Sequence, residues 1–110
     1  MAVSNTDDHL RNHAFILTKN GWVLSPIYDV NPVPYGEDLA INVNETESTV
    51  SIKFAIDTAG YFGIDENIAK DTAEKIVSIV RSNWEKSAKE YGISRGKIED
   101  MRPAFSECYR

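Results

Sequence analysis

The sequence predicts a mainly α-helical fold in which a small β-hairpin is followed by a bundle of about three to four helices. Apolar residues recur at helical spacing between residues 69 and 91, over about six turns. An Asn-Gly pair at 20–21 separates two apolar, β-prone runs, which is a strong local signal for a hairpin. The chain of 110 residues has the length of one small domain.

The hairpin is expected over residues 14–25. Its strands are the runs AFILT at 14–18 and WVLS at 22–25, and the Lys-Asn-Gly segment between them supplies the turn. Residues 26–36, PIYDVNPVPYG, hold three of the four prolines, so this segment is predicted to be an irregular loop. The polar residues 42–49 are predicted to form a surface loop.

A helical bundle is predicted for residues 51–108. The first helix starts near residue 51 and stops at Gly63, and Asp65 caps a long second helix. Ser94 caps a last helix that Pro103 breaks or kinks. The long helix is expected to face the core with one apolar stripe: Ala69, Ala73, Ile76, Val77, Val80, Trp84, Ala88 and Tyr91.

Composition narrows the classes of function. The net charge of −5 argues against sequence-independent nucleic-acid binding, because phosphate neutralisation needs clustered lysines and arginines. The single cysteine, Cys108, cannot form an intramolecular disulfide and indicates a reducing compartment. No segment has the pattern of a signal peptide or a membrane span. We therefore expect a cytoplasmic protein with no membrane partner and no direct nucleic-acid binding.

Residues 5–13, NTDDHLRNH, hold the densest set of functional groups in the chain. Asp7 and Asn12 have the spacing found in the H-R-D-x-x-x-x-N loop of protein kinases, where the Asp accepts a proton and the Asn binds a metal ion. Kinase chemistry also needs a second metal-binding Asp, and Asp29 follows the predicted hairpin. Because a hairpin returns the chain to its starting point, Asp29 should lie near Asn12.

Other interpretations of this cluster stay open on spacing alone. Asp7 or Asp8 could cap a helical turn, while Asn12 satisfies the local backbone. His9 and His13, at positions i and i+4, have the spacing of metal ligands on a helix, although an apolar strand follows them directly.

Two motifs together resemble the C-terminal part of HipA-type serine/threonine kinases, the toxins of HipA–HipB toxin–antitoxin modules. The first motif is NTDDHLRN at 5–12, and the second is WVLSPIYDVNP at 22–32. The family pattern is an N/T-[DG]-x-H-x-x-N loop, a hairpin and a W-x-L-[ST]-P-x-Y-D motif. The AGYFG segment at 59–63 and the long helix around Trp84 extend the resemblance over most of the chain. The resemblance implies that residues 1–110 form a single partial domain, a C-terminal kinase-like lobe fragment.

The resemblance makes residues 5–12 a catalytic-type loop and residues 26–36 a metal-binding-type loop. It places Asp7 at the catalytic position, and it places Asn12 and Asp29 at the positions that hold Mg²⁺. The complete family enzyme uses ATP and Mg²⁺ to phosphorylate a protein substrate on serine or threonine.

Three further residues are expected to support the site. His9 matches a loop histidine with a structural hydrogen-bonding role, and Tyr28 is expected to contact the cofactor. Asp8 supports the catalytic loop in a role that stays open. Because it adjoins Asp7, the assignment of the base carries an ambiguity of one position.

Several parts of a kinase are not found in these 110 residues. The six glycines include no G-x-G-x-x-G motif, and no lysine lies in a V-A-I-K-like strand. We expect an expressed fragment, a split-gene product or a remnant that needs an N-terminal kinase lobe as partner and binds no ATP or Mg²⁺ tightly alone. A HipB-like antitoxin is another possible partner. Exposed apolar residues are expected to cause some self-association: Phe15, Leu17, Tyr28 and Tyr35.

Two alternatives to the kinase hypothesis remain. The first is a non-catalytic protein-interaction or regulatory module derived from the same fold. The second is an unrelated small helical protein, which a large distance between Asp29 and Asn12 would reveal.

Overall fold

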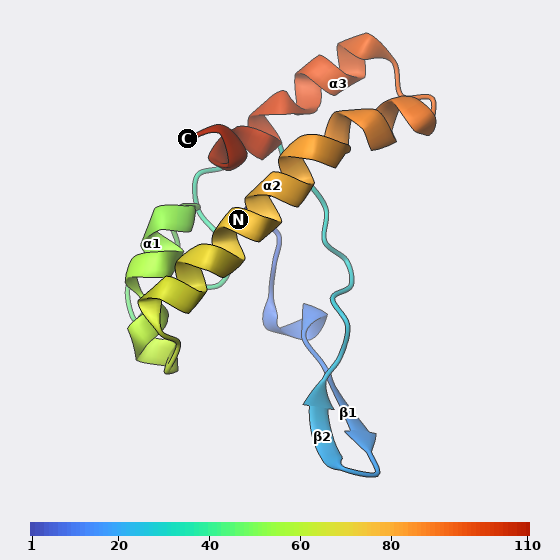
Figure 1. The fold of residues 1–110 in the computed structure, drawn as a ribbon. Helices are drawn as coiled ribbons and strands as arrows, with labels where there is room; N and C mark the ends of the chain where they lie inside the picture. Colours follow the sequence, from blue (N-terminus) through green and yellow to red (C-terminus); the bar gives the residue numbers. More distant parts are fainter.

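The computed structural model describes residues 1–110 and has the predicted architecture, a β-hairpin followed by helices (Figure 1). The hairpin consists of β1 (Phe15–Thr18) and β2 (Gly21–Leu24), and the α-helices are α1 (Ile52–Asp57), α2 (Glu66–Glu90) and α3 (Arg95–Met101). Three short 3-10 helices complete the chain: η1 (Leu10–Asn12), η2 (Ala59–Phe62) and η3 (Arg102–Tyr109). None of the helices combines the length and hydrophobicity needed to cross a bilayer.

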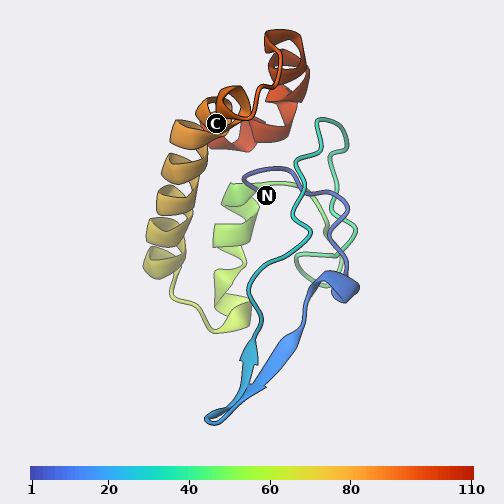
Figure 2. The same ribbon diagram turned by 90° about the vertical axis from the view of Figure 1, so that its right-hand side faces the viewer.

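The hairpin is antiparallel, with Phe15 opposite Leu24 and Thr18 opposite Gly21. Gly21 has a φ of 109°, whereas Lys19 and Asn20 in the turn keep negative φ values. This pattern differs from a type I′ turn, which needs positive φ at both central residues. The glycine of the Asn-Gly pair therefore serves as the first residue of β2, and the hairpin projects from the helical body (Figure 2).

The segment between β2 and α1 forms loops that lie against the first residues of the chain. The Val33 amide donates to the Ser4 carbonyl (3.3 Å), and the Ala40 amide donates to the Thr6 carbonyl (3.1 Å). Gly36 has a φ of 93°, and a Cβ there would lie 3.4 Å from the Thr6 methyl group. These contacts hold the loop after the hairpin beside the start of the chain.

Side-chain caps begin all three α-helices, and the caps at Asp65 and Ser94 were predicted. The Ser51 hydroxyl accepts from the Phe54 amide at the start of α1, and the Asp65 carboxylate accepts from the first amides of α2. The first predicted helix is divided in the structure. Its α-helical part ends at Asp57, because the Thr58 hydroxyl bonds back to two preceding carbonyls and the chain continues as η2.

The predicted stripe of α2 is the half-buried face of that helix from Ala69 to Ala88. Tyr91 does not belong to it, because this residue follows the last turn of α2 and is 86% exposed. Ile76 lies at the edge of the stripe and remains exposed.

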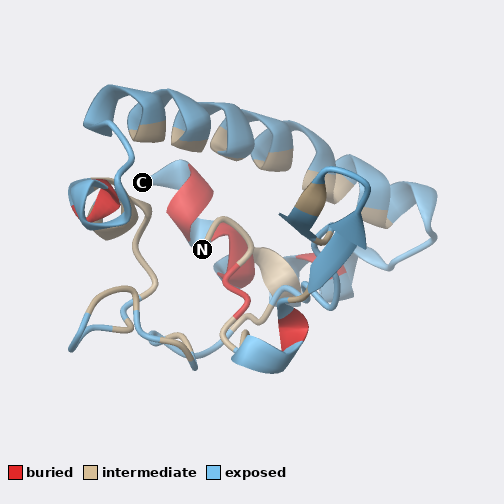
Figure 3. Ribbon diagram, turned by 90° about the horizontal axis from the view of Figure 1, so that it is seen from below, coloured by how far each residue is buried: buried red, intermediate tan, exposed pale blue.

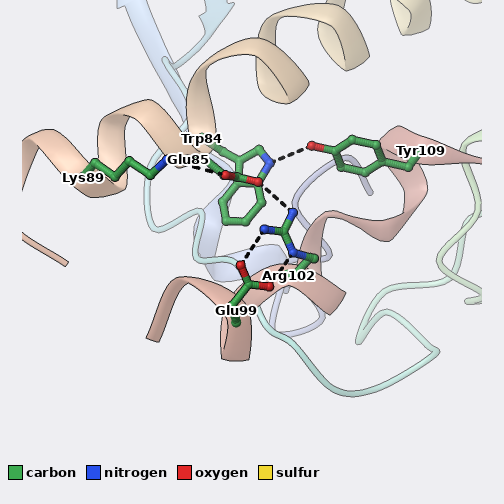
Figure 4. A network of polar contacts seen from close by, with 6 residues as sticks. All are labelled: Trp84, Glu85, Lys89, Glu99, Arg102 and Tyr109. Carbon is green, nitrogen blue, oxygen red and sulfur yellow. Dashed lines mark hydrogen bonds and ion pairs between the residues drawn. The ribbon is translucent and has the colours of Figure 1, made fainter. Parts of the chain in front are cut away.

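The C-terminal 3-10 helix η3 contains four of the ten buried residues of the chain, namely Ala104, Phe105, Glu107 and Cys108. Phe105 stacks on Trp84 of α2, with ring centroids 4.2 Å apart. The indole N–H of Trp84 also donates to the Tyr109 hydroxyl (3.1 Å), as Figure 4 shows. These aromatic contacts fix η3 against the middle of α2.

Arg102 joins α2 to the end of α3. Its guanidinium makes a bidentate ion pair with Glu99 (2.9 Å for each contact) and bonds Glu85 on α2 at 2.7 Å (Figure 4). The hydrogen bonds from Arg102 hold the pKa of the Glu99 carboxyl below its usual value. Lys89 completes the network at 4.0 Å from Glu85.

The molecule has little interior for its length. Ten of 110 residues are buried, and Figure 3 shows them confined to short stretches of the ribbon. The accessible surface of 8159 Å² exceeds the value of about 6,100 Å² expected for a compact protein of this mass. The radius of gyration of 15.4 Å also exceeds the expected value of about 13 Å. A large apolar surface therefore remains open.

Glu107 links the two ends of the helical body, because its buried carboxylate accepts a hydrogen bond from the Ile52 amide at the start of α1 (3.0 Å). Glu107→Ala leaves that amide without its partner and should lower the free energy of unfolding by about 1–3 kcal/mol in urea denaturation. Glu90→Ala, at an exposed site on α2, is the control and should change it by less than about 0.5 kcal/mol. Equal effects of the two substitutions would contradict this role of Glu107.

Candidate functional site

The two residues predicted to share a metal ion lie together in the structure. Asn12 is the last residue of η1 and is buried, while Asp29 follows β2 in the proline-rich loop. The Asn12 Nδ2 donates to the Asp29 Oδ2 at 3.0 Å. The hairpin thus brings together two side chains that are 17 residues apart, which argues against the alternative of an unrelated fold.

Asp29 has an unusual backbone conformation, with a φ of 55° in the left-handed region. Non-glycine residues adopt it infrequently, and aspartate tolerates it better than most, so such outliers often mark functional sites. The side chain is held at both oxygens, because Asn31 Nδ2 donates to Oδ1 (2.8 Å) while Asn12 donates to Oδ2. The surroundings therefore define where this carboxylate points.

Tyr28 ties the two loops together. Its hydroxyl donates to the Arg11 carbonyl at 2.7 Å, next to Asn12 in the sequence. Tyr28 thus braces the catalytic-type loop against the metal-binding-type loop, and its contact with the cofactor stays a prediction.

The two adjacent aspartates differ in their contacts. The Asp8 Oδ1 lies 2.9 Å from the His13 Nε2, so this carboxylate is engaged at the start of the hairpin. Asp7 is exposed and makes no hydrogen bond or ion pair through its side chain. Asp7 therefore has the free carboxylate of the pair.

The histidines do not form the alternative metal site. His13 contacts Asp8, and His9 lies outside any helix, just before η1. The His9 Nδ1 is buried and has no hydrogen-bond partner in the chain. A buried nitrogen without a partner is unfavourable, and no contact within the chain compensates for it.

The oxygen atoms of Asn12 and Asp29 fit a magnesium ion in chemical type. Mg²⁺ prefers hard oxygen ligands and is usually held by one or two protein groups, with phosphate oxygens and waters completing its shell. No group of three or more His, Cys, Asp or Glu side chains could hold a metal ion. Asn12 and Asp29 alone offer only two ligands, so other groups would have to complete the shell of such an ion.

The sequence analysis missed two residues that shape the site. Asn31 bonds the Asp29 carboxylate, and the buried Asn5 accepts from the Asn31 amide (3.4 Å) through its Oδ1. The position of Asn31 in the sequence could have identified it, because it stands two residues after Asp29 and directly before a proline. Asparagine there often bonds to nearby groups.

The fold and the site define a small, mainly helical domain. In it, a hairpin brings an asparagine amide and an aspartate carboxylate into contact. A family described as the HipA-like C-terminal domain matches residues 1–84, which include the site, the hairpin and most of α2. The chain belongs to this family. No curated protein and no solved structure matches the chain.

The backbone of Asp29 provides a test of the site's construction. Asp29→Ala and Asp29→Gly both remove the side-chain hydrogen bonds, but only alanine is strained at positive φ. The alanine variant should therefore be the less stable of the two by about 1 kcal/mol in urea denaturation. At Asp38, whose φ is not positive, alanine should be at least as stable as glycine. The same order of stability at both positions would contradict the left-handed conformation.

Proposed function

We propose that the chain is the catalytic-loop segment of a HipA-like protein serine/threonine kinase and works only together with an ATP-binding lobe. The contact between Asn12 and Asp29 across the hairpin is the observation that supports this best. Membership of the HipA-like C-terminal domain family supports it independently. A protein that uses ATP in this way belongs in the cytoplasm.

In this proposal Asp7 accepts the proton of the substrate hydroxyl, because its carboxylate has no partner in the chain while that of Asp8 contacts His13. Asn12 Oδ1 and the Asp29 carboxylate would hold Mg²⁺. The ion, when bound, neutralises the negative charge that develops on the transferred phosphoryl group. Asn31 and Tyr28 position the Asp29 loop through their hydrogen bonds.

The ATP-binding lobe must come from another polypeptide segment, because nothing in the chain covers or grips the phosphates. The hairpin is suited to receive it. Both strands are apolar and exposed, and a two-stranded hairpin is only marginally stable without further packing. A protein substrate and a HipB-like antitoxin are further proposed partners.

Manganese binding tests the metal site on the chain itself. Mn²⁺ should broaden the NMR signals of Asn12 and Asp29 before others, with a dissociation constant of about 1 mM or weaker, because the chain offers only two ligands. Asn12→Ala and Asp29→Asn should remove the effect, and the exposed Asp38→Asn should keep it. Broadening that is unchanged in both site variants would contradict the proposed ligands.

Phosphoryl transfer tests the catalytic role. The chain alone should not incorporate labelled phosphate from ATP and Mg²⁺, whereas mixing it with the N-terminal lobe of a HipA-like kinase should restore autophosphorylation. Asp7→Asn should lower the restored rate by at least about 100-fold, and Asp8→Asn should lower it much less.

Two outcomes of that experiment would contradict the proposal. Robust autophosphorylation by the isolated chain, abolished in Asp7→Asn, would show that no second lobe is needed. Restored activity that is insensitive to Asp7→Asn would remove this residue from the chemistry and favour a non-catalytic interaction module.

A further inference from the structure

A large apolar groove lies between α1 and α2, beside the candidate site. It has a volume of about 1000 Å³, and 18 of its 21 lining residues are hydrophobic. One wall is α2, the other is α1 with η2, and residues from the start of the chain and from the Asp29 loop complete the lining. An exposed apolar surface of this extent is typical of a site where another polypeptide segment docks.

The wall formed by α2 carries a second apolar row that nothing in the chain covers. Ile68 and Ile76 line the groove and are 62% and 48% exposed, and Thr72 lies between them at the same four-residue spacing. Ile79 extends the row and is 64% exposed. Residues spaced in this way form a ridge along one helix face, which is the surface against which another helix packs.

The chemistry of the lining favours a helix as occupant. The polar lining residues are Asn42, Thr58 and Thr72, and both threonine hydroxyls already donate to backbone carbonyls of their own helices. A strand placed here would leave its amides and carbonyls without partners. A helix satisfies its backbone internally and needs none from the groove.

We propose that a second copy of the chain fills this role, and that two chains pair through their α1–α2 grooves with the two α2 helices antiparallel. The exposed surface is about 2,000 Å² larger than that of a compact protein of this size. A stable interface buries about 800 Å² on each partner, which is less than this excess, to which the exposed hairpin also contributes. The pairing is isologous and packs the α1–α2 pair of one copy across that of the other, as in a four-helix bundle.

Charge favours the antiparallel arrangement. Asp71 and Lys75 lie on the flank of the exposed row, and neither makes an ion pair within the chain. A two-fold axis near the middle of the row, between Thr72 and Ile76, brings Asp71 of each copy close to Lys75 of the other. The flank of the interface is then complementary rather than repulsive.

The pairing also bears on the candidate site. Ile27 and Val30, which lie on either side of Asp29 in the sequence, line the same groove. Filling the groove therefore packs the apolar side of the loop whose polar side holds Asp29 against Asn12. The projecting hairpin is not among the groove-lining residues and remains free for another partner.

Sedimentation velocity of the full chain tests the proposal. The mass should rise from 12.4 kDa to twice that value as the concentration increases from about 1 µM to about 100 µM. Ile68→Glu and Ile76→Glu place a carboxylate in the apolar interface and should each weaken dimerisation at least about tenfold. Ile16→Glu on the hairpin is the matched control, since Ile16 is 47% exposed, and it should leave the dimer intact.

A charge exchange gives a second measurement at exposed positions that do not endanger folding. Asp71→Lys and Lys75→Asp should each weaken the dimer, and the double variant should restore it. A chain that stays monomeric at about 100 µM would overturn the proposal, as would polydisperse aggregation in place of a closed dimer. So would dissociation by Ile16→Glu but not by Ile76→Glu, because it would place the interface on the hairpin.

Discussion

The hydrogen bond between Asn12 and Asp29 is the contact on which the site depends. Neither residue lies in an α-helix or a strand, so their proximity depends on the register of the hairpin between them. A slip of one residue would turn every strand side chain to the opposite face and move Asp29 away. The residues that connect the two strands set this register, and Gly21 among them has a backbone conformation that other residues rarely adopt.

Polar contacts stabilise the loops next to the hairpin, which has neither the third strand nor the covering helix that supports other small sheets. The hydroxyl of Tyr28 reaches the Arg11 carbonyl, and the Asn31 side chain and amide connect Asp29 to Asn5. These bonds hold the loops while the apolar strands stay exposed. The left-handed conformation of Asp29 is tolerated because both of its carboxylate oxygens are bonded.

The helical body has a similar division between a fixed part and an open part. At the C-terminal end, Phe105 stacks on Trp84 and Glu107 caps α1, so η3 holds the two helices together. Towards the start of α2 the groove stays open, and the row that includes Ile68 and Ile76 has no partner. Two separate apolar surfaces, on the hairpin and in the groove, explain why so few residues are buried.

Much of this structure follows from local sequence signals. The hairpin, the caps at Asp65 and Ser94 and the inward stripe of α2 each depend on residues close in the chain, and these predictions are confirmed. The early end of α1 was missed, because the back-bonding of Thr58 competes with a continuous apolar pattern.

The proximity of Asn12 and Asp29 was predicted because an antiparallel hairpin brings the segments before and after it close together. The roles of Asn5 and Asn31 and the cap from Glu107 could not be predicted. They depend on how segments far apart in the sequence meet, and no spacing rule encodes that.

The most direct test is the position of a metal ion in crystals of the chain soaked in Mn²⁺. Anomalous diffraction should show a peak within about 2.5 Å of the Asn12 Oδ1 and an Asp29 carboxylate oxygen, with the Asn12 amide turned to present its oxygen. A peak at another acidic cluster, with the bond from the Asn12 Nδ2 to Asp29 unchanged, would contradict the assignment of this pair as the metal site.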